Sequence, residues 1–364
     1  MRLEEKMNRK IKVKNGMQAL VSLLMAFVVS GILMAICGYQ PFLIFGAIIS
    51  GAFGSNSAIV QTMIQATPLI FSGLAYIFAS KAGMFNLGME GQIYMGGIAA
   101  AAIGGMNLGL PAPVHIGLTL CAGMIAGGLF GALAGVMKAC FGANEVISTL
   151  MLNFVAINLT SYLVNYPLKA PGPVAQTQNV MPSAMLPKLS AHSQLSAAIL
   201  LAVFTAFAVR YFLGRTAKGF DITVTGSNRK AAQTAGVRIR RILILAMFVS
   251  GAIAGIGGAC HITGVDRRFV DGFSAGYGFD GIAVAALASN RPLMVLVSSI
   301  IFGALRAGAL RLNMTTNLPT DFISVIQALV VIFVAAPMLV EDLKSSGYKL
   351  AGRLTGRRKE AKEQ

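Results

Sequence analysis

The chain has 364 residues, of which 55% are hydrophobic and 12% are charged. Soluble domains carry about 25% charged residues, so the composition excludes an ordinary soluble domain and predicts an all-α membrane protein with spans of about 20 apolar residues. A net charge of +17 would suggest nucleic-acid binding in a soluble protein. Here the Lys and Arg residues lie at the ends of apolar runs, where they set topology, and we expect contact with membrane lipid and no nucleic-acid partner.

Apolar runs of spanning length predict a polytopic helix bundle with about ten transmembrane helices. The expected spans are 17–38, 60–80, 89–108, 114–137, 146–166, 195–213, 242–263, 277–290, 293–310 and 321–340. The short run 41–54 is expected to be an external or re-entrant piece, although it could extend a neighbouring span. The chain then divides into a basic N-terminus (1–16), a transmembrane domain (17–343) and a basic tail (344–364).

Basic residues are distributed unequally between the two sides of these spans. One side collects the N-terminus, Lys81, Lys138, the loop 210–241, Arg291 and the tail, with 24 of the 30 Lys and Arg residues. Because Lys and Arg near span ends resist translocation, this side is expected to face the cytoplasm, with both termini there. The protein should be a multi-pass protein of a cell membrane.

The segment 81–92 (KAGMFNLGMEGQ) places Asn86, Glu90 and Gln92 between two apolar runs. Intramembrane ionisable groups are candidates for function. Glu90 could instead cap a helix or pair with Lys81, and the sequence leaves these alternatives open.

A second polar element, NEVISTLMLN, begins at Asn144 and ends at Asn153. Asn144 can cap the following helix, and Glu145 suits a helix N-terminus electrostatically. Asn153 is costly in a membrane unless it is hydrogen-bonded. Bonding between helices and a role in a transport path remain equally open.

The loop 167–193 contains five prolines, which exclude a continuous helix, and it is expected to be external. Glycines at close spacing within the runs 123–135 and 251–258 predict helices that pack tightly in the membrane.

The loop 210–241 is the longest polar stretch between two spans and carries eight Lys/Arg against one Asp. Asn228 can cap a short helix over Arg229–Ala235, and Gly236 can end it. A short helix presented between two spans is a plausible docking element for a cytosolic partner.

A third polar element follows at GYGFDG, where Asp280 begins the short run 277–290. Asp280 could cap that helix or face a polar cavity, as short helices do in transporters. The preceding Asp266, Arg267, Arg268 and Asp271 could form an external mouth, or an exposed salt-bridged loop.

Motifs for chemistry are absent from the sequence. It contains no GxxxxGK[ST] loop for ATP phosphates and no HExxH, GxSxG or paired-carboxylate site. The four Cys and three His residues show no metal spacing. We therefore expect no enzyme activity, no cofactor and no metal site, and any ATP-driven step must come from another chain.

Several segments together resemble one family. KAGMFNLGMEGQ, NEVISTLMLNFVA, TAKGFDITVTGSNRKAAQTAGV, SGAIAGIGGA and GYGFDGIAVAALASNRP occur in this order over residues 60–340. They resemble bacterial ABC-importer permeases for branched-chain amino acids, ribose-type sugars and nucleosides, and most of all the longer permease of nucleoside systems. The sequence departs from the usual Leu-Gly at Ala288-Ser289-Asn290.

The resemblance implies an ABC-importer permease fold in a bacterial inner or plasma membrane. It also implies ATPase subunits, a second permease subunit and a substrate-binding lipoprotein or periplasmic protein as partners. The loop 214–241 would couple to the ATPase through Gly219, Asp221, Gly226, Asn228, Ala231, Ala232 and Gly236. The candidates for the substrate path are Asn86, Glu90, Gln92, Asn144, Glu145, Asn153, Phe279 and Asp280.

Three alternatives remain at the level of sequence. An ion-coupled secondary transporter of a small polar solute could use Glu90 and Asp280 as coupling carboxylates. An intramembrane enzyme lacks a nucleophile–base or metal set. A membrane scaffold would tolerate bulky residues at Gly226 or Ala232.

Overall fold

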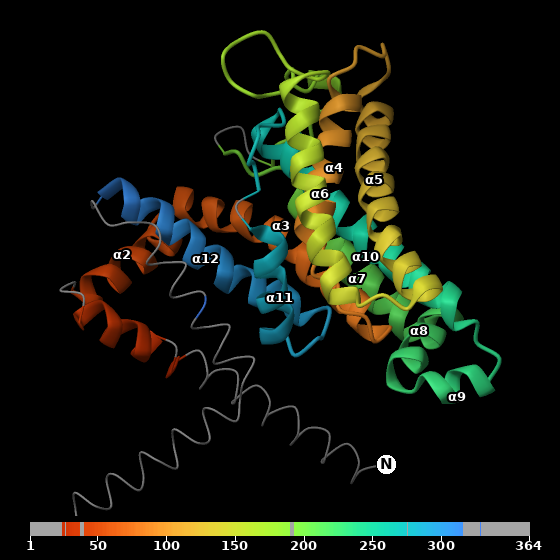
Figure 1. The fold of residues 1–364 in the computed structure, drawn as a ribbon. Coiled ribbons are helices and arrows are strands. Elements are labelled where there is room, and N and C mark those ends of the chain that lie inside the picture. The colour runs from red at the N-terminus through yellow and green to blue at the C-terminus, as the bar shows by residue number, and fades with distance from the viewer. Residues whose placement is uncertain are drawn as a thin grey trace, which may run out of the picture. The chain divides into compact units, whose positions relative to one another are not determined.

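The computed structural model describes residues 24–25, 27–36, 40–189, 193–274, 276–315 and 328. Its regular structure within these residues is helical, apart from two isolated antiparallel bridges. In chain order the helices are α2 (Pro41–Phe53), α3 (Asn56–Lys81), α4 (Met89–Gly104), α5 (Ala112–Phe141), α6 (Glu145–Asn165), η1 (Pro182–Ala184), α7 (Ala198–Arg215), α8 (Ala217–Ser227), α9 (Arg229–Thr234), α10 (Ile239–His261), η2 (Ile262–Asp266), α11 (Tyr277–Leu287) and α12 (Met294–Thr315) (Figure 1). The all-α prediction is confirmed for the described part of the chain.

The chain forms two compact units. One unit is Ala47–Thr315, and the other joins Met1–Gly46 to Thr316–Gln364. The second unit includes the short apolar helix Phe27–Ile36. The predicted span 321–340 and both basic ends lie outside the described residues, apart from Ala328.

Six helices of the described residues are long and apolar enough to cross a membrane, namely α3, α5, α6, α7, α10 continued by η2, and α12. The helices α2 and α11 are apolar but shorter. Each predicted span from 60–80 to 293–310 contains a helix. The run 41–54 forms α2, and Ser55 then caps α3 by accepting a hydrogen bond from Ala58 N at 3.2 Å. It therefore does not extend the following span.

Close glycine contacts hold α4, α5 and α10 together. A Cβ added to Gly127 of α5 would lie 2.5 Å from the Gly251 carbonyl oxygen and 2.7 Å from the Gly255 Cα of α10. A Cβ on Gly96 of α4 would overlap the Gly255 backbone. Since a methyl group has no room at these positions, small residues are required for the helices to approach, as the glycine spacing predicts.

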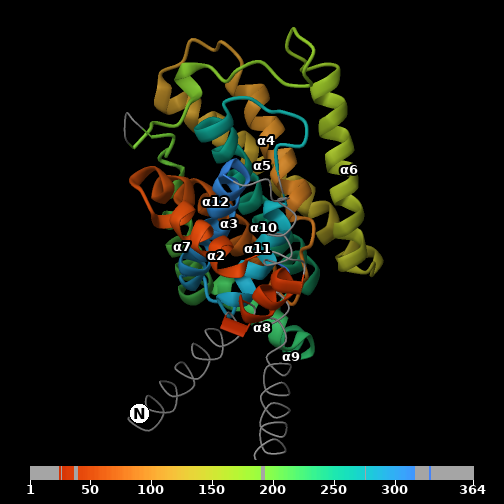
Figure 2. The same cartoon turned by 90° about the vertical axis from the view of Figure 1, so that its left-hand side faces the viewer.

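The two ends of the Ala47–Thr315 unit differ in structure. The helices α8 and α9 lie at one end, and the proline-rich segment lies at the other (Figures 1 and 2). That segment is non-helical apart from η1, as predicted, and pairs with the 267–271 strand-like stretch. Val180 N donates to Arg267 O at 2.7 Å, and Thr177 N donates to Phe269 O at 2.9 Å.

The short helix expected over Arg229–Ala235 forms as α9. The preceding helix α8 is absent from the sequence-based prediction. Its sequence contains β-branched residues and two glycines, which lower helix propensity. Its N-terminus is stabilised by Thr216, whose Oγ1 accepts from Gly219 N at 3.0 Å.

The turn after α11 contains the departure from the usual Leu-Gly. Ser289 and Asn290 both adopt positive φ values, 52° and 53°. Glycine occupies such positions without steric cost, and Asn tolerates them better than most residues.

Candidate functional site

Three buried amide side chains and one hydroxyl gather where α3, α4, α6 and α10 meet, and we call Asn86, Gln92, Asn153 and Ser250 the amide cluster. Asn86 Nδ2 donates to Gln92 Oε1 at 2.9 Å and to Ser250 Oγ at 2.8 Å. Ser250 Oγ in turn donates to the Ala75 carbonyl at 2.7 Å. All four side chains are buried.

The amide cluster fixes the non-helical link between α3 and α4. Asn153 Oδ1 accepts from Gly91 N at 2.8 Å, and its Nδ2 donates to Leu87 O at 2.7 Å. Thr149 Oγ1 accepts from Leu87 N at 3.2 Å. A break between two helices leaves backbone N–H and C=O groups without helical partners, and these side chains supply the missing hydrogen bonds. These bonds run between helices, one of the two alternatives that the sequence left open for Asn153.

A second group surrounds the start of α11, and we call Gln65, Glu90, Tyr277, Asp280 and Arg306 the α11 cluster. Glu90 is 4% exposed. Its Oε1 accepts from Gly276 N at 3.2 Å, and its Oε2 accepts from Gly278 N at 2.6 Å. Glu90 belongs to α4, and its carboxylate thus caps the N-terminus of a different helix, α11. Negative charge is favourable there because the helix N-terminus is electropositive.

Asp280 and Arg306 form the ion pair of this cluster. Arg306 Nε and Nη2 both lie 2.8 Å from Asp280 Oδ2. The guanidinium carbon also sits 4.3 Å from the centroid of the Tyr277 ring, and Tyr277 donates to Gln65 Oε1 at 2.7 Å. Charged groups within apolar helices are costly unless paired, so this arrangement makes the charge of α12 tolerable.

The remaining candidates for the substrate path lie elsewhere. Asn144 caps α6, as predicted, and its Oδ1 accepts from Val146 N at 2.9 Å. Glu145 pairs with Lys138 Nζ at 2.7 Å. Phe279 precedes Asp280 in α11, but its side chain is 45% exposed and does not belong to the buried polar clusters. Asn144, Glu145 and Phe279 are therefore separate from the polar clusters that hold the other five candidates.

The predicted coupling residues lie in a segment that we define as residues 216–236. Gly226 packs against the turn after α3, where an added Cβ would overlap Lys81 O and lie 2.7 Å from Gly83 N. Arg229 Nη2 donates to the carbonyl of Gly83 at 3.2 Å. The segment therefore contacts the chain three residues before Asn86 of the amide cluster.

Each of the other coupling candidates has a distinct position. Asn228 Oδ1 accepts from Ala231 N at 3.1 Å and caps α9, while Gly236 ends it with φ of 82°. Ala232 is fully buried, whereas its neighbour Ala231 is exposed. Two further candidates belong to α8: Gly219 packs too closely on the Phe212 carbonyl for a Cβ, and Asp221 lies 3.8 Å from Lys218 Nζ.

The sequence-based selection missed Gln65, Ser250 and Arg306. Arg306 carried the clearest signal, because an arginine inside an apolar run requires a partner. Its pairing with Asp280 could have been inferred from that rule. Ser250 carried no signal, because serine is common where helices pack closely.

Long apolar helices with buried, internally bonded polar clusters are typical of a multi-pass membrane protein. The chain belongs to the family described as branched-chain amino acid transport system / permease component, whose model matches residues 58–335. The chain is thus a permease component of an ABC importer and not an enzyme. This assignment decides against the ion-coupled and scaffold alternatives.

Individual relatives match over most of their length. The guanosine ABC transporter permease protein NupP of Bacillus subtilis is 33% identical over 87% of this chain and 92% of its own. The glucose ABC transporter permease protein TsgB13 of Haloferax volcanii is 30% identical over 86% of this chain and 85% of its own. A second Bacillus subtilis protein, the guanosine ABC transporter permease protein NupQ, is 26% identical over 66% and 78%, respectively.

Proposed function

We propose that this permease carries nucleosides or simple sugars into the cell. The observation that carries the proposal is the 33% identity, over 87% of the chain, to a permease named for guanosine. A relative named for glucose is nearly as similar, at 30%. Both solutes are neutral and rich in hydroxyl groups.

The pairing of charges supports a neutral solute. Asp280 is bound to Arg306, and Glu90 is bound to the start of α11. Amides and hydroxyls then remain as the polar groups of the buried clusters. Such groups recognise hydroxyls and ring nitrogens through hydrogen bonds.

Uptake of labelled guanosine and glucose tests the substrate class. The measurement uses cells that lack their own carriers and express this chain with its ATPase, second permease and binding protein. We expect saturable uptake of at least one solute, which stops when the ATPase is inactivated. Uptake driven by an ion gradient without the ATPase would contradict the proposal, as would transport of branched-chain amino acids alone.

We infer a topology of about ten spans, with both termini and the 216–236 segment in the cytoplasm. The position of Lys81 supports the assignment of Lys81 and this segment to the same side of the membrane, because the Lys81 carbonyl adjoins Gly226. Lys138, assigned to that side as well, lies at the C-terminal end of α5. The proline-rich segment at the opposite end would receive solute from the binding protein. In a cysteine-free background, Ser227→Cys should resist a membrane-impermeant thiol reagent in intact cells, and Lys169→Cys should react with it.

We also infer that the 216–236 segment docks on the ATPase subunits. Ala232 is buried and Ala231 is exposed on the same short helix. Ala232→Arg should reduce both ATPase association and uptake at least tenfold, because an arginine at this buried position disrupts the packing of α9 against the rest of the chain. Gln233→Arg is the matched control for added charge, because Gln233 is exposed on the same helix and is not a coupling candidate, and it should retain association and uptake. Normal uptake and association in Ala232→Arg would contradict the coupling role.

A heterodimer with a second, shorter permease is the assembly we propose. Bacillus subtilis has two proteins named as guanosine permeases, and both are similar to this chain. Copurification of tagged and untagged copies distinguishes the assemblies. We expect the tagged chain to retain the second permease and not an untagged copy of itself.

A further inference from the structure

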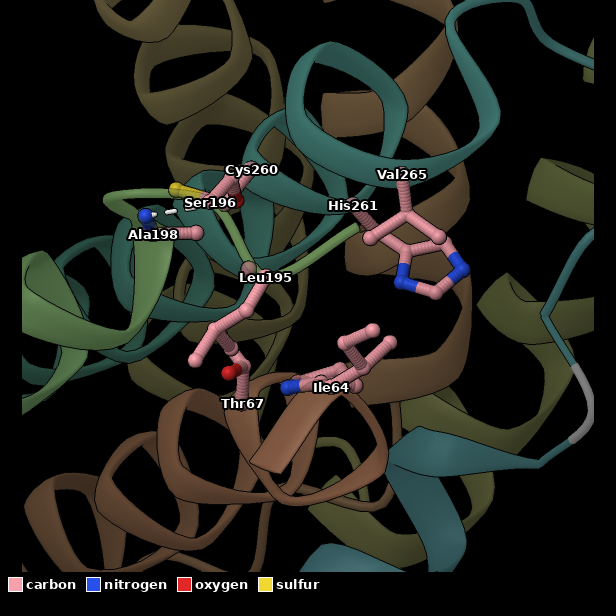
Figure 3. Close-up of a pocket in the computed structure, with 10 residues that line it drawn as sticks. Ile64, Thr67, Leu195, Ser196, Ala198, Cys260, His261 and Val265 are labelled. Carbon is pink, nitrogen blue, oxygen red and sulfur yellow. Dashed lines mark hydrogen bonds between the residues drawn. The ribbon is translucent and has the colours of Figure 1, made fainter. Parts of the chain in front are cut away.

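Two interrupted helices face each other in the Ala47–Thr315 unit, outside both polar clusters. Pro68 lies inside α3. Opposite it, α10 ends at His261 and continues as the π-helix η2. Residues of both helices, with Leu195 and Ser196 before α7, line a small pocket (Figure 3). Proline interruptions and π-helical turns both leave backbone groups without ordinary helical bonds, and π-bulges are frequent at functional sites.

The imidazole of His261 supplies an unused hydrogen-bonding group in this pocket. The residue is 8% exposed, and its ring points into the pocket, toward Ile64 (Figure 3). Its Nε2 lies 3.4 Å from Asp266 Oδ2. Its Nδ1 is buried and has no hydrogen-bond partner among the residues that the structure describes. Buried polar groups without a partner are rare and call for an explanation.

The charge beside Nε2 determines what Nδ1 can bind. A carboxylate next to Nε2 favours the tautomer that carries its proton there. Nδ1 of the neutral ring then keeps its lone pair and can only accept a hydrogen bond. Asp266 thus acts as a positioning residue for an acceptor that faces the pocket.

The opposite wall of the pocket is formed by α3 around Pro68. Pro68 has no backbone N–H, so the carbonyl of Ile64 lacks its usual helical donor. The Thr67 hydroxyl, in contrast, donates to Met63 O at 2.8 Å. Nδ1 of His261 is therefore the acceptor that the pocket offers to an incoming donor, and an O–H group fits this chemistry.

We propose that Nδ1 of His261 accepts a hydrogen bond from a hydroxyl of the transported solute. The proposal rests on the proposed function, since nucleosides and sugars supply such hydroxyls. In this structure the pocket has room for about one water molecule, which matches one hydroxyl and not a sugar ring. A bound water offers the same O–H chemistry and is the alternative occupant.

The position of the ring connects this contact to the α11 cluster. The His261 ring centroid lies 5.4 Å from that of Tyr277, and the Tyr277 ring carries Arg306 on its face. A hydroxyl bound at Nδ1 would therefore lie beside the start of α11. This helix is short, as are helices at the substrate sites of many transporters.

Two isosteric substitutions separate the nitrogen atoms of the ring. His261→Asn keeps an acceptor near the Nδ1 position, and His261→Gln places its amide near Nε2 and withdraws the acceptor from the pocket. The complete importer in proteoliposomes is assayed for uptake of guanosine and its 2′-, 3′- and 5′-deoxy analogues. The binding protein is identical in every assay, so its own selectivity cancels when each variant is compared with wild type.

We expect the uptake of one deoxy analogue to respond to His261→Gln differently from the uptake of guanosine. His261→Gln should lower guanosine uptake about tenfold, the effect of one lost hydrogen bond. It should leave the analogue without the contacted hydroxyl within about twofold of its wild-type rate. His261→Asn should preserve the wild-type order of the four compounds. If the His261→Gln importer does not assemble, His261→Ala is used in its place, because it removes the same acceptor.

His115 provides a matched control, because it is buried with both ring nitrogens engaged. Its Nδ1 lies 2.9 Å from Ser183 Oγ, and its Nε2 lies 3.1 Å from Ile103 O. His115→Gln should lower the uptake of all four compounds by one factor. The same uniform loss in His261→Gln would overturn the proposal and assign a water or a packing role to His261.

Failure of the proposed function gives a different result. If the wild-type importer takes up none of the four nucleosides, the comparison is repeated with glucose and its monodeoxy derivatives. A wild-type importer that carries neither class contradicts the proposed substrate class and the hydroxyl contact together. Wild-type uptake with unchanged selectivity in His261→Gln overturns the hydroxyl contact alone.

Discussion

The 216–236 segment and the α11 cluster satisfy their polar groups in opposite ways. In the segment, Thr216 and Asn228 each bond a backbone N–H three residues ahead, at 3.0 and 3.1 Å. In the α11 cluster, Glu90 binds Gly278 at 2.6 Å from a different part of the chain. Local bonds therefore maintain a short exposed element, while long-range charged bonds hold buried helices together.

The difference predicts how each region responds to substitution. A local cap can be lost with a small change in stability, because water replaces the missing partner. A buried charge has no such substitute. We therefore expect changes in the α11 cluster to reduce the amount of folded protein, and changes in the segment to reduce coupling while leaving the bundle folded.

The largest effect should follow from Arg306→Met, which leaves Asp280 within the bundle without its cation. Breaking a buried pair costs about 3–5 kcal/mol, so the yield of folded protein in detergent should fall sharply. The double variant Arg306→Met with Asp280→Asn should recover most of the loss, because both charges are gone. If the single variant unfolds at the wild-type midpoint, the ion pair does not stabilise the bundle.

Glu90→Gln should have the next largest effect. The amide retains the shape but weakens two bonds to the start of α11, at a cost of about 1.5–3 kcal/mol. Glu145→Gln is the control, because its pair with Lys138 lies at a helix end and should cost about 1 kcal/mol or less. Thermal unfolding of the two purified variants provides the measurement. Equal midpoints would show that burial does not distinguish these carboxylates.

The same contrast explains how far the sequence could predict this protein. Helix caps at Asn144 and Asn228, the glycine contacts of α5 with α10 and the break at the prolines all depend on neighbouring residues or simple spacing, and each was predicted. The partners of Glu90 and Asp280 depend on how distant helices pack. The sequence restricts such partners to other polar residues, and only the fold selects Gly276, Gly278 and Arg306.

Helix α8 marks a further limit of prediction from sequence. Propensity disfavours it, yet Gly219 and Gly226 are the residues that let it approach neighbouring backbone. The glycines that weaken the helix are the residues that allow its packing. Tertiary contact therefore overrides propensity here.

Gly226→Ala should give an intermediate effect and separates the segment from the bundle. Its methyl group would overlap the Lys81 carbonyl, and overpacking of this kind costs about 1–3 kcal/mol. We expect a several-fold loss of uptake at normal abundance. Gly214→Ala is the control, since an added Cβ there meets no atom of the described chain within 4 Å. Similar uptake in the two variants would remove the contact with the α3–α4 link from the coupling mechanism.

Asn228→Ala should have the smallest effect on stability and the most specific effect on coupling. Loss of the cap costs about 1 kcal/mol, and because α9 has only six residues, that cost is large relative to its own stability. The bundle should therefore keep its unfolding midpoint while ATPase association weakens. Asn228→Ser retains a capping oxygen and should restore association. If serine and alanine behave alike, the asparagine acts through direct contact with the ATPase and not through the cap.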